Sequence, residues 1–199
     1  MCVTRRLLLL ASSLWLAACS VVGDRGGTEE PRHAVVERVG EVEIREYVPR
    51  LAAEVTVEGD EEAARSAGFR SLAAYIFGKN RTGKDIAMTA PVAAQPSAPG
   101  RWTIRFFMPS EYNDQTLPAP ADPAVRIVAV PAETMAVLRF TGSRSAEAMA
   151  RGRAELLRAL RAGPWVVAGE PVDWFYDPPW TLPMLRRNEV AVPVRRSGS

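Results

Sequence analysis

The chain has 199 residues, and its 25 Lys and Arg residues are nearly balanced by 23 Asp and Glu residues. A chain of this length can form one domain with a sizeable buried core. Because the charge is close to neutral and the sequence has no cluster of Lys and Arg, it argues against binding to a nucleic-acid backbone.

The N-terminus has the features of a bacterial export signal. Two arginines precede the apolar run at residues 7–18, which is too short to anchor a protein across a bilayer. The run ends at Cys19, and the sequence "LAAC" resembles a lipobox, in which the cysteine is acylated. We therefore expect residues 1–18 to be a lipoprotein signal peptide and Cys19 to be the lipidated residue. The alternative is an ordinary secretory signal that contains a cysteine.

Residues 19–34 are polar and rich in glycine, which predicts a flexible tether that leads from Cys19 to a single domain at residues 35–199. Ser20 favours the outer membrane of a Gram-negative cell envelope, with the domain facing the periplasm. The other cysteine, Cys2, lies in the signal, so the exported domain has no disulfide and no catalytic thiol.

The first half of the domain reads as strands, a helix and two more strands. Apolar and charged residues alternate over residues 42–45 and 53–58, as in half-buried strands. Asp60 is a good N-cap for a helix that ends at Gly78. Residues 86–94 and 101–109 are expected to be the next two strands.

The second half repeats this order. Strands are expected at residues 125–130, 134–142, 165–176 and 188–194, and Ser145 caps the helix between them. An offset of 83 matches Ile44 with Ile127, and an offset of 84 matches Phe106 with Val190.

These matches define repeat 1 at about residues 35–110 and repeat 2 at about residues 124–194. Two such units can bury sheet faces that neither could cover alone. We therefore predict an α+β fold in which two pseudo-symmetric βαββ repeats form a distorted antiparallel barrel of about eight strands, flanked by two helices.

The sequence offers little machinery for catalysis. Residues 78–85 differ from a phosphate-binding loop because Asp85 replaces the required Ser or Thr and because the segment follows a helix, so a turn is the better interpretation. The only histidine, His33, lies in the predicted tether, which leaves a Ser/His/Asp triad without a fixed base. No spacing of Cys, His, Asp and Glu indicates a metal site. We expect a protein that is not an enzyme, although a hydrolase with unrecognised residues remains an alternative.

An aromatic loop near the C-terminus is the best candidate for binding. Four aromatic residues fall within residues 174–180, prolines stiffen the segment, and Met184 and Leu185 precede Arg186 and Arg187. Such a loop suits a flat, apolar ligand that carries carboxylates. Alternatively, the loop seals one end of the barrel core.

Six motifs together resemble the SOUL haem-binding protein family: "VEIREYVPRLAA", "GFRSLAAYIFGKN", "KDIAMTAPV", "IRFFMPSEY" with "LPAPADPAV", "FYDPPW" and "RRNEV". The resemblance covers about residues 35–194 and implies the doubled barrel described above. It also implies that haem or a related tetrapyrrole binds to an apolar patch beside the first helix. The positions that match this patch and its flanking loop are Phe69, Arg70, Ala73, Trp180, Met184, Leu185 and Arg186.

The sequence departs from some animal members at the histidine proposed as their axial ligand, because "VEIREYVPRL" contains none. Haem iron would then be bound by Tyr47, Met88, Met184 or no protein ligand. Of these, Met88 is expected to share a strand face with Ile86 and Ala90 and to pack inside the barrel.

The lipobox-like N-terminus and the family resemblance together predict a membrane-anchored lipoprotein that binds haem or a porphyrin reversibly and non-covalently through apolar contacts. No other cofactor and no metal site are expected. The alternative is an envelope module for protein interaction, or for sensing a small hydrophobic ligand, that has no tetrapyrrole role.

Overall fold

The computed structural model describes residues 27–161 and 163–198. The predicted signal peptide, Cys19 and the first part of the predicted tether lie outside the described residues. Within the described part of the chain, no helix is long and apolar enough to cross a membrane.

The elements follow the predicted order in both repeats. The first half contains β1 (His33–Val39), β2 (Val42–Tyr47), β3 (Arg50–Glu58), α2 (Glu61–Ile76), β4 (Val92–Ala98) and β5 (Arg101–Phe107). The second half contains β6 (Arg126–Val130), β7 (Glu133–Phe140), α3 (Ala146–Leu160), β8 (Trp165–Val167), β9 (Val172–Phe175), the 3-10 helix η1 (Pro183–Leu185) and β10 (Asn188–Arg196).

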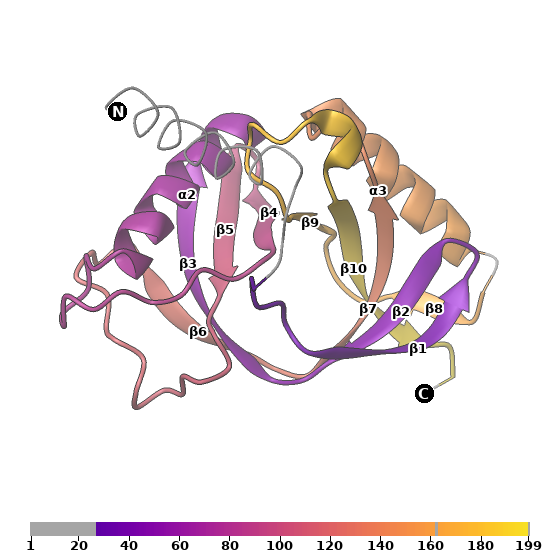
Figure 1. Ribbon diagram of the computed structural model, residues 1–199. Helices are drawn as coiled ribbons and strands as arrows, with labels where there is room; N and C mark the ends of the chain where they lie inside the picture. The colour runs from indigo at the N-terminus through magenta and orange to yellow at the C-terminus, as the bar shows by residue number, and fades with distance from the viewer. Residues whose placement is uncertain (1–26, 162, 199) are drawn as a thin grey trace, which may run out of the picture.

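The strands form one antiparallel sheet of ten strands in the order β1-β2-β7-β10-β9-β4-β5-β3-β6, with β8 paired to β10. The sheet curves strongly without closing, and α2 and α3 lie on its outer side (Figure 1). The predicted α+β class, distorted barrel and two flanking helices are confirmed. The described residues contain more strands than the expected eight or so, because β1 and the short β8 add to the repeats.

The two repeats exchange strands. The first strand of repeat 1, β2, pairs with β7 of repeat 2, and β6 of repeat 2 pairs with β3 of repeat 1. The two pairings are related by the repeat. Ile44 lies opposite Ala136, and their counterparts at the offset of 83, Ile127 and Ala53, also lie opposite each other. The central strands β4 and β9 also pair with each other. Neither repeat therefore completes its own sheet, and the two repeats share one sheet.

The register of β10 corrects the sequence match of the two repeats. Val55 pairs with Ile104, and Leu138, the counterpart of Val55, pairs with Val190. By this pairing Ile104, and not Phe106, is the counterpart of Val190. The sequence match was two residues out of register, and it went unnoticed because a shift of two keeps every side chain on the same face.

The two helices begin at their predicted caps. Asp60 accepts a hydrogen bond from the backbone N–H of Ala63 at 2.8 Å, and Ser145 accepts one from Ala148 at 3.4 Å. In the middle of α2, Gly68 lies so close to β5 that an added Cβ would be 2.4 Å from Cγ1 of Ile104. The glycine allows the helix to approach the sheet closely, despite its cost in helix propensity.

Apolar side chains fill both faces of the sheet. One cluster joins the helices to the sheet and includes Ile44, Leu72, Ile104, Leu156 and Val190. A second cluster lies on the opposite face and includes Tyr47, Phe107, Met135, Trp174 and Tyr176. Neighbouring residues of one strand enter different clusters because strand side chains alternate between faces. Much of the opposite face is therefore buried, although neither α2 nor α3 covers it.

The prediction that Met88 packs inside the barrel is wrong. Ile86 and Ala90 are buried, but the Met88 side chain is 41% exposed. Residues 86–91 do not form a strand, since β4 begins only at Val92 after Pro91, which lacks a backbone N–H. Thr89 turns inward instead, and its hydroxyl donates a hydrogen bond of 2.6 Å to the Phe107 carbonyl.

Candidate functional site

The loop between β9 and β10 is folded compactly on itself. Its two ends meet, because Phe175 pairs with Asn188. The Arg186 guanidinium donates from Nε to the Thr181 carbonyl at 2.7 Å and from Nη2 to the Pro179 carbonyl at 2.9 Å. The Gly142 N–H donates to the Pro183 carbonyl at 2.9 Å and joins the loop to the end of β7. These bonds fix the loop conformation between α2 and α3 (Figure 1).

The loop presents large apolar side chains to solvent. Trp180 is 63% exposed and Met184 is 74% exposed, and Leu182 and Leu185 are also exposed. Exposed side chains this large contribute little to the core, whereas Tyr176 at the start of the loop and Thr181 within it are buried, so only these residues fit the alternative that the loop seals the barrel. Large apolar side chains that are exposed together on one short loop are typical of a binding site.

The predicted residues on α2 lie on the same outer side of the sheet. Phe69 is 37% exposed and packs edge-on against Phe106, with ring centroids 5.3 Å apart. Ala73 is half-buried and Arg70 is exposed. Within the described part of the chain, no hydrogen bond or ring contact joins these three residues to the β9–β10 loop. The structure therefore places the predicted residues in two groups, one on α2 and one on the loop.

Sequence reasoning missed a positively charged group at the base of the loop. Arg144 is half-buried and forms no hydrogen bond or ion pair with any described residue. Burial and the nearby charges of Arg65 and Arg186 lower the pKa of Arg144. Its position immediately before Ser145, the N-cap of α3, was the only sequence signal, because an arginine at a helix N-terminus is electrostatically unfavourable.

Paired charges lie buried beneath this group and connect the helices. Asp173 of β9 is 1% exposed and forms an ion pair with Arg153 of α3, and Arg153 also lies 3.9 Å from Glu61 of α2. Burial raises the pKa of Asp173 to about 6, although Arg153 opposes the shift. The Arg65 guanidinium lies 4.4 Å from the centre of the Phe175 ring. These contacts hold both helices over β9, where the loop begins.

The possible iron ligands lie in different places. Tyr47 is 4% exposed on the opposite face of the sheet, where it accepts a hydrogen bond from Nη1 of Arg45, and burial raises its pKa to about 12. A tyrosinate ligand there would have no access to the loop. His33 also lies away from the loop, in β1, with its ring 4.9 Å from that of Tyr47. Among the candidates, only the Met184 thioether is both exposed and part of the loop.

The opposite face contains an ionic network around Glu189, which is fully buried. Its carboxylate accepts hydrogen bonds from both terminal nitrogens of Arg45, from Nε of Arg187 and from the Tyr176 hydroxyl. Burial opposes ionisation, but the hydrogen bond and charge of Arg45 hold the pKa of Glu189 below its usual value. Arg187 also donates to Glu30 at 2.8 Å.

The N-terminal segment is therefore attached to the domain earlier than expected. The predicted tether extended to Ala34, whereas Glu30 reaches the Glu189 network and the Glu29 carbonyl accepts a hydrogen bond from Ala90 at 2.9 Å.

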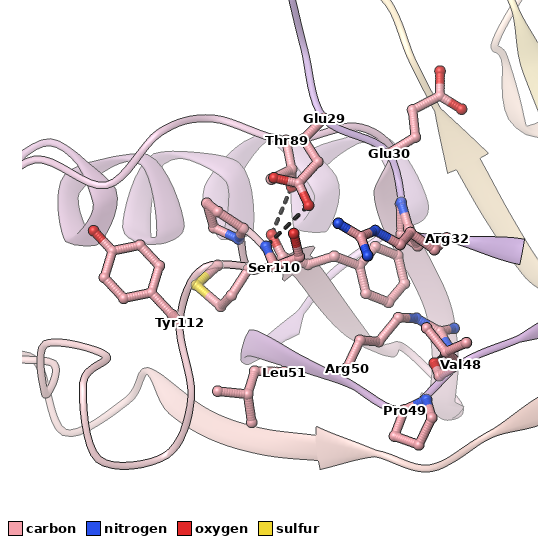
Figure 2. Close-up of a pocket in the computed structure, with 14 residues that line it drawn as sticks. Glu29, Glu30, Arg32, Val48, Pro49, Arg50, Leu51, Thr89, Ser110 and Tyr112 are labelled. Atoms are coloured by element: carbon pink, nitrogen blue, oxygen red, sulfur yellow. Dashed lines mark hydrogen bonds between the residues drawn. The ribbon is translucent and has the colours of Figure 1, made fainter.

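Two hollows lie near the N-terminal segment on this side of the sheet. A cavity of about 240 Å³ lies between the N-terminal segment, the β2–β3 turn and the end of β5 (Figure 2), and an open groove of about 560 Å³ adjoins it. Neither is lined by any of the seven predicted ligand residues. The predicted apolar patch is thus an exposed surface and not one of these cavities. Within the described residues, no group of three His, Cys, Asp or Glu side chains could hold a metal ion.

Solved structures share this fold at low sequence identity. The C-terminal domain of EcmrR aligns with a TM-score of 0.62 and 8% identity, over 78% of this chain and 97% of that domain. A hydrolase from Listeria innocua aligns with a TM-score of 0.53 and 11% identity, over 86% of this chain and 94% of the hydrolase. These likenesses establish the fold and nothing about activity.

The chain is also similar in sequence to curated proteins and to a family model. Heme-binding protein 2 of Homo sapiens is 35% identical over 115 residues, and that of Mus musculus is 33% identical over 115 residues. Each match covers 54% of this chain and 56% of the relative, so the chain spans about half the length of these proteins. The model described as SOUL heme-binding protein matches residues 28–193. Since that match covers most of the chain, the protein belongs to the SOUL heme-binding protein family.

Proposed function

We propose that this protein binds haem or another tetrapyrrole reversibly and non-covalently on the exposed apolar surface of the β9–β10 loop. Family membership supports tetrapyrrole binding. The proposed location of the binding site rests on one observation. A single hydrogen-bonded loop exposes the large apolar side chains of Trp180, Leu182, Met184 and Leu185. A fixed apolar surface loses little entropy when it binds a flat ligand.

The residues present fit a tetrapyrrole with carboxylate side chains. Trp180 and Met184 supply apolar contact for the macrocycle. Arg144 is the best partner for a propionate, because its guanidinium has no partner among the described residues, and Arg70 on α2 is exposed and also free. Arg186 is less suited to this role because it already holds the loop. Bound haem would supply a redox-active iron, to which the loop offers only the Met184 thioether.

The expected affinity follows from apolar burial. If the ligand buries ~300 Å² of apolar surface at ~25 cal/mol/Å², the gross gain is about 7 kcal/mol before ordering costs. Micromolar binding is therefore expected without a strong iron ligand. The proposal is for binding and not for catalysis.

The proposal includes attachment to a membrane. Cleavage before Cys19 and acylation of its thiol would place the domain at the outer membrane, facing the periplasm. The test is the mass of the mature N-terminus purified from a Gram-negative host. A diacylated or triacylated Cys19 supports the anchor, and an unmodified N-terminus at any other residue contradicts it.

The binding proposal is tested by titrating the chain without residues 1–19, which retains every described element, with haem and with metal-free protoporphyrin. Similar micromolar affinities are expected for both ligands, because the contacts are apolar and electrostatic. A much tighter affinity for haem would contradict binding without a dedicated iron ligand. Failure of both ligands to saturate the protein would contradict the function itself.

A further inference from the structure

The cavities gather around one short segment at the N-terminal end of the described chain. Residues 29–32 line the cavity of about 240 Å³, and Arg32 also lines the open groove of about 560 Å³. The two spaces share Val48 and Pro49 as well, so the groove leads up to the cavity. Neither space is lined by a residue of the β9–β10 loop, and the tetrapyrrole proposal does not use them.

The cavity has an apolar floor. It is lined by the buried side chains of Phe107 and Met108, and by Leu51, Pro109 and Tyr112 around them (Figure 2). The backbone N–H of Met108 and the carbonyl of Leu51 are already hydrogen-bonded to each other at 2.9 Å. An apolar group that entered from the groove would therefore exchange water for carbon contacts.

Two opposite charges face this floor without pairing with each other. The Arg32 guanidinium forms no hydrogen bond or ion pair with any described residue, and it points into the cavity towards Ser110 (Figure 2). The Glu29 carboxylate accepts a hydrogen bond from the Ser110 N–H at 2.9 Å through one oxygen. Its second oxygen has no partner among the described residues, which leaves it able to accept another hydrogen bond.

The other charged groups at the cavity are already committed. The Glu30 carboxylate points away from the cavity and pairs with Arg187 at 2.8 Å. The Arg50 guanidinium forms an ion pair with Glu133 and lies 4.8 Å from the ring centres of both Tyr47 and Phe107, although its buried Nε has no hydrogen-bond partner among the described residues. The charged groups most available to a ligand are therefore the Arg32 guanidinium and the Glu29 carboxylate, beside an apolar floor.

We propose that this cavity binds an α-amino acid with an apolar side chain. The ligand carboxylate pairs with Arg32, its ammonium group donates to Glu29, and its side chain lies on the floor formed by Phe107, Met108 and Leu51. A simple acid would meet repulsion from Glu29, and a simple amine would meet repulsion from Arg32. The volume also fits, because drug-sized ligands use pockets of ~300–1,000 Å³ and this cavity is slightly smaller.

The test is a calorimetric titration of the full chain in detergent micelles with phenylalanine. Two analogues of similar shape each lack one charge: 3-phenylpropionate has no ammonium group, and phenethylamine has no carboxylate. Phenylalanine is expected to saturate the protein with a dissociation constant on the order of 0.1–1 mM, the range for about a dozen heavy atoms with few polar contacts. Each analogue is expected to bind at least about tenfold more weakly. Absence of saturable phenylalanine binding, or equal binding of either analogue, would overturn the proposal.

Three variants test which residues bind the carboxylate and the ammonium group of the ligand. Arg32→Gln is expected to weaken phenylalanine binding about tenfold and leave phenethylamine no weaker than before. Glu29→Gln keeps the acceptor for Ser110 and is expected to weaken phenylalanine about tenfold without weakening 3-phenylpropionate. Arg81→Gln removes an exposed arginine that lines neither space, and it should change the affinity for neither phenylalanine nor 3-phenylpropionate. Equal effects of Arg32→Gln and Arg81→Gln would show that the charge acts non-specifically and would contradict the site. Protoporphyrin binding by the Arg32→Gln variant should stay unchanged, which separates this proposal from the tetrapyrrole one.

Discussion

The two sides of the sheet differ in which apolar groups they expose and in which charged groups are paired. On the helical side the β9–β10 loop exposes Trp180 and Met184, while Asp173 and Arg153 are paired beneath it. On the opposite side the apolar residues are covered, and unpaired charges face a cavity instead. A broad exposed surface suits a large flat ligand, whereas a small enclosed space suits a small polar one. One chain can therefore present two independent binding sites.

The opposite side should depend most strongly on charge pairing. Glu189→Leu leaves Arg45 buried without its main partner, so we expect a loss of about 3–5 kcal/mol in the free energy of unfolding. Urea denaturation measures the change. The control is Glu58→Ala, which breaks the exposed ion pair with Arg101 and should cost less than about 1 kcal/mol. Equal costs would mean that the buried network has no special role.

The helical side should respond to pH through Asp173, whose pKa rises from 3.8 to about 6 on folding. The folded protein binds this proton more tightly than the unfolded chain does, so the group's contribution to stability is present below about pH 4 and is lost as the pH rises through about 6. Asp173→Asn cannot ionise. We expect its free energy of unfolding, relative to the unsubstituted protein, to rise by roughly 2–3 kcal/mol between pH 4 and pH 7.

Denaturation curves at several pH values test this expectation. The comparison of the two proteins cancels the titration of groups that do not interact with Asp173, including Glu189, whose lowered pKa acts in the opposite sense. A difference that stays constant with pH would mean that Asp173 titrates normally.

An added methyl group should destabilise the packing between α2 and the sheet more than the packing between α3 and the sheet. The Cβ added by Gly68→Ala would lie 2.4 Å from Ile104, whereas that added by Gly152→Ala would lie 2.9 Å from the edge of the half-buried Phe140 ring. We expect Gly68→Ala to lower the free energy of unfolding by about 1–3 kcal/mol, and Gly152→Ala to lower it less. Thermal unfolding of both variants tests the order, and a reversed order would show that α2 can move away from the sheet.

The smallest effect concerns the exposed loop itself. Trp180→Ala should weaken protoporphyrin binding about fivefold to tenfold and leave the melting temperature nearly unchanged, since the side chain is 63% exposed. Val166→Ala is the control, because Val166 is also exposed and apolar but lies in β8. If both variants bind protoporphyrin as tightly as the unsubstituted protein does, the ligand does not contact Trp180.

Local features of the fold were predictable from sequence, and long-range ones were not. The caps Asp60 and Ser145 and the alternating strands are encoded by neighbouring residues, so their positions could be predicted. The exchange of β2 and β6 between the repeats depends on contacts across the whole chain. Residues 50 and 133, which the offset of 83 makes equivalent, even form an ion pair with each other. No local pattern indicates such a pairing.

For the candidate site, too, local features could be predicted from the sequence and long-range contacts could not. The exposed apolar residues of the loop were identified because an aromatic, proline-rich segment is unusual. Met88 was placed wrongly because strand alternation was extended across Pro91. Arg144 was missed because its lack of a partner is visible only once the surrounding residues are in place.

The most direct test of the account is to locate the tetrapyrrole on the protein. Amide chemical shifts of the isotope-labelled domain, recorded with increasing metal-free protoporphyrin, report which backbone groups the ligand approaches. We predict the largest changes at residues 180–187 and around Arg144, with little change at residues 29–32 and 48–51. Changes concentrated at residues 29–32 and 48–51 would contradict the account, because the tetrapyrrole would then occupy the opposite side of the sheet.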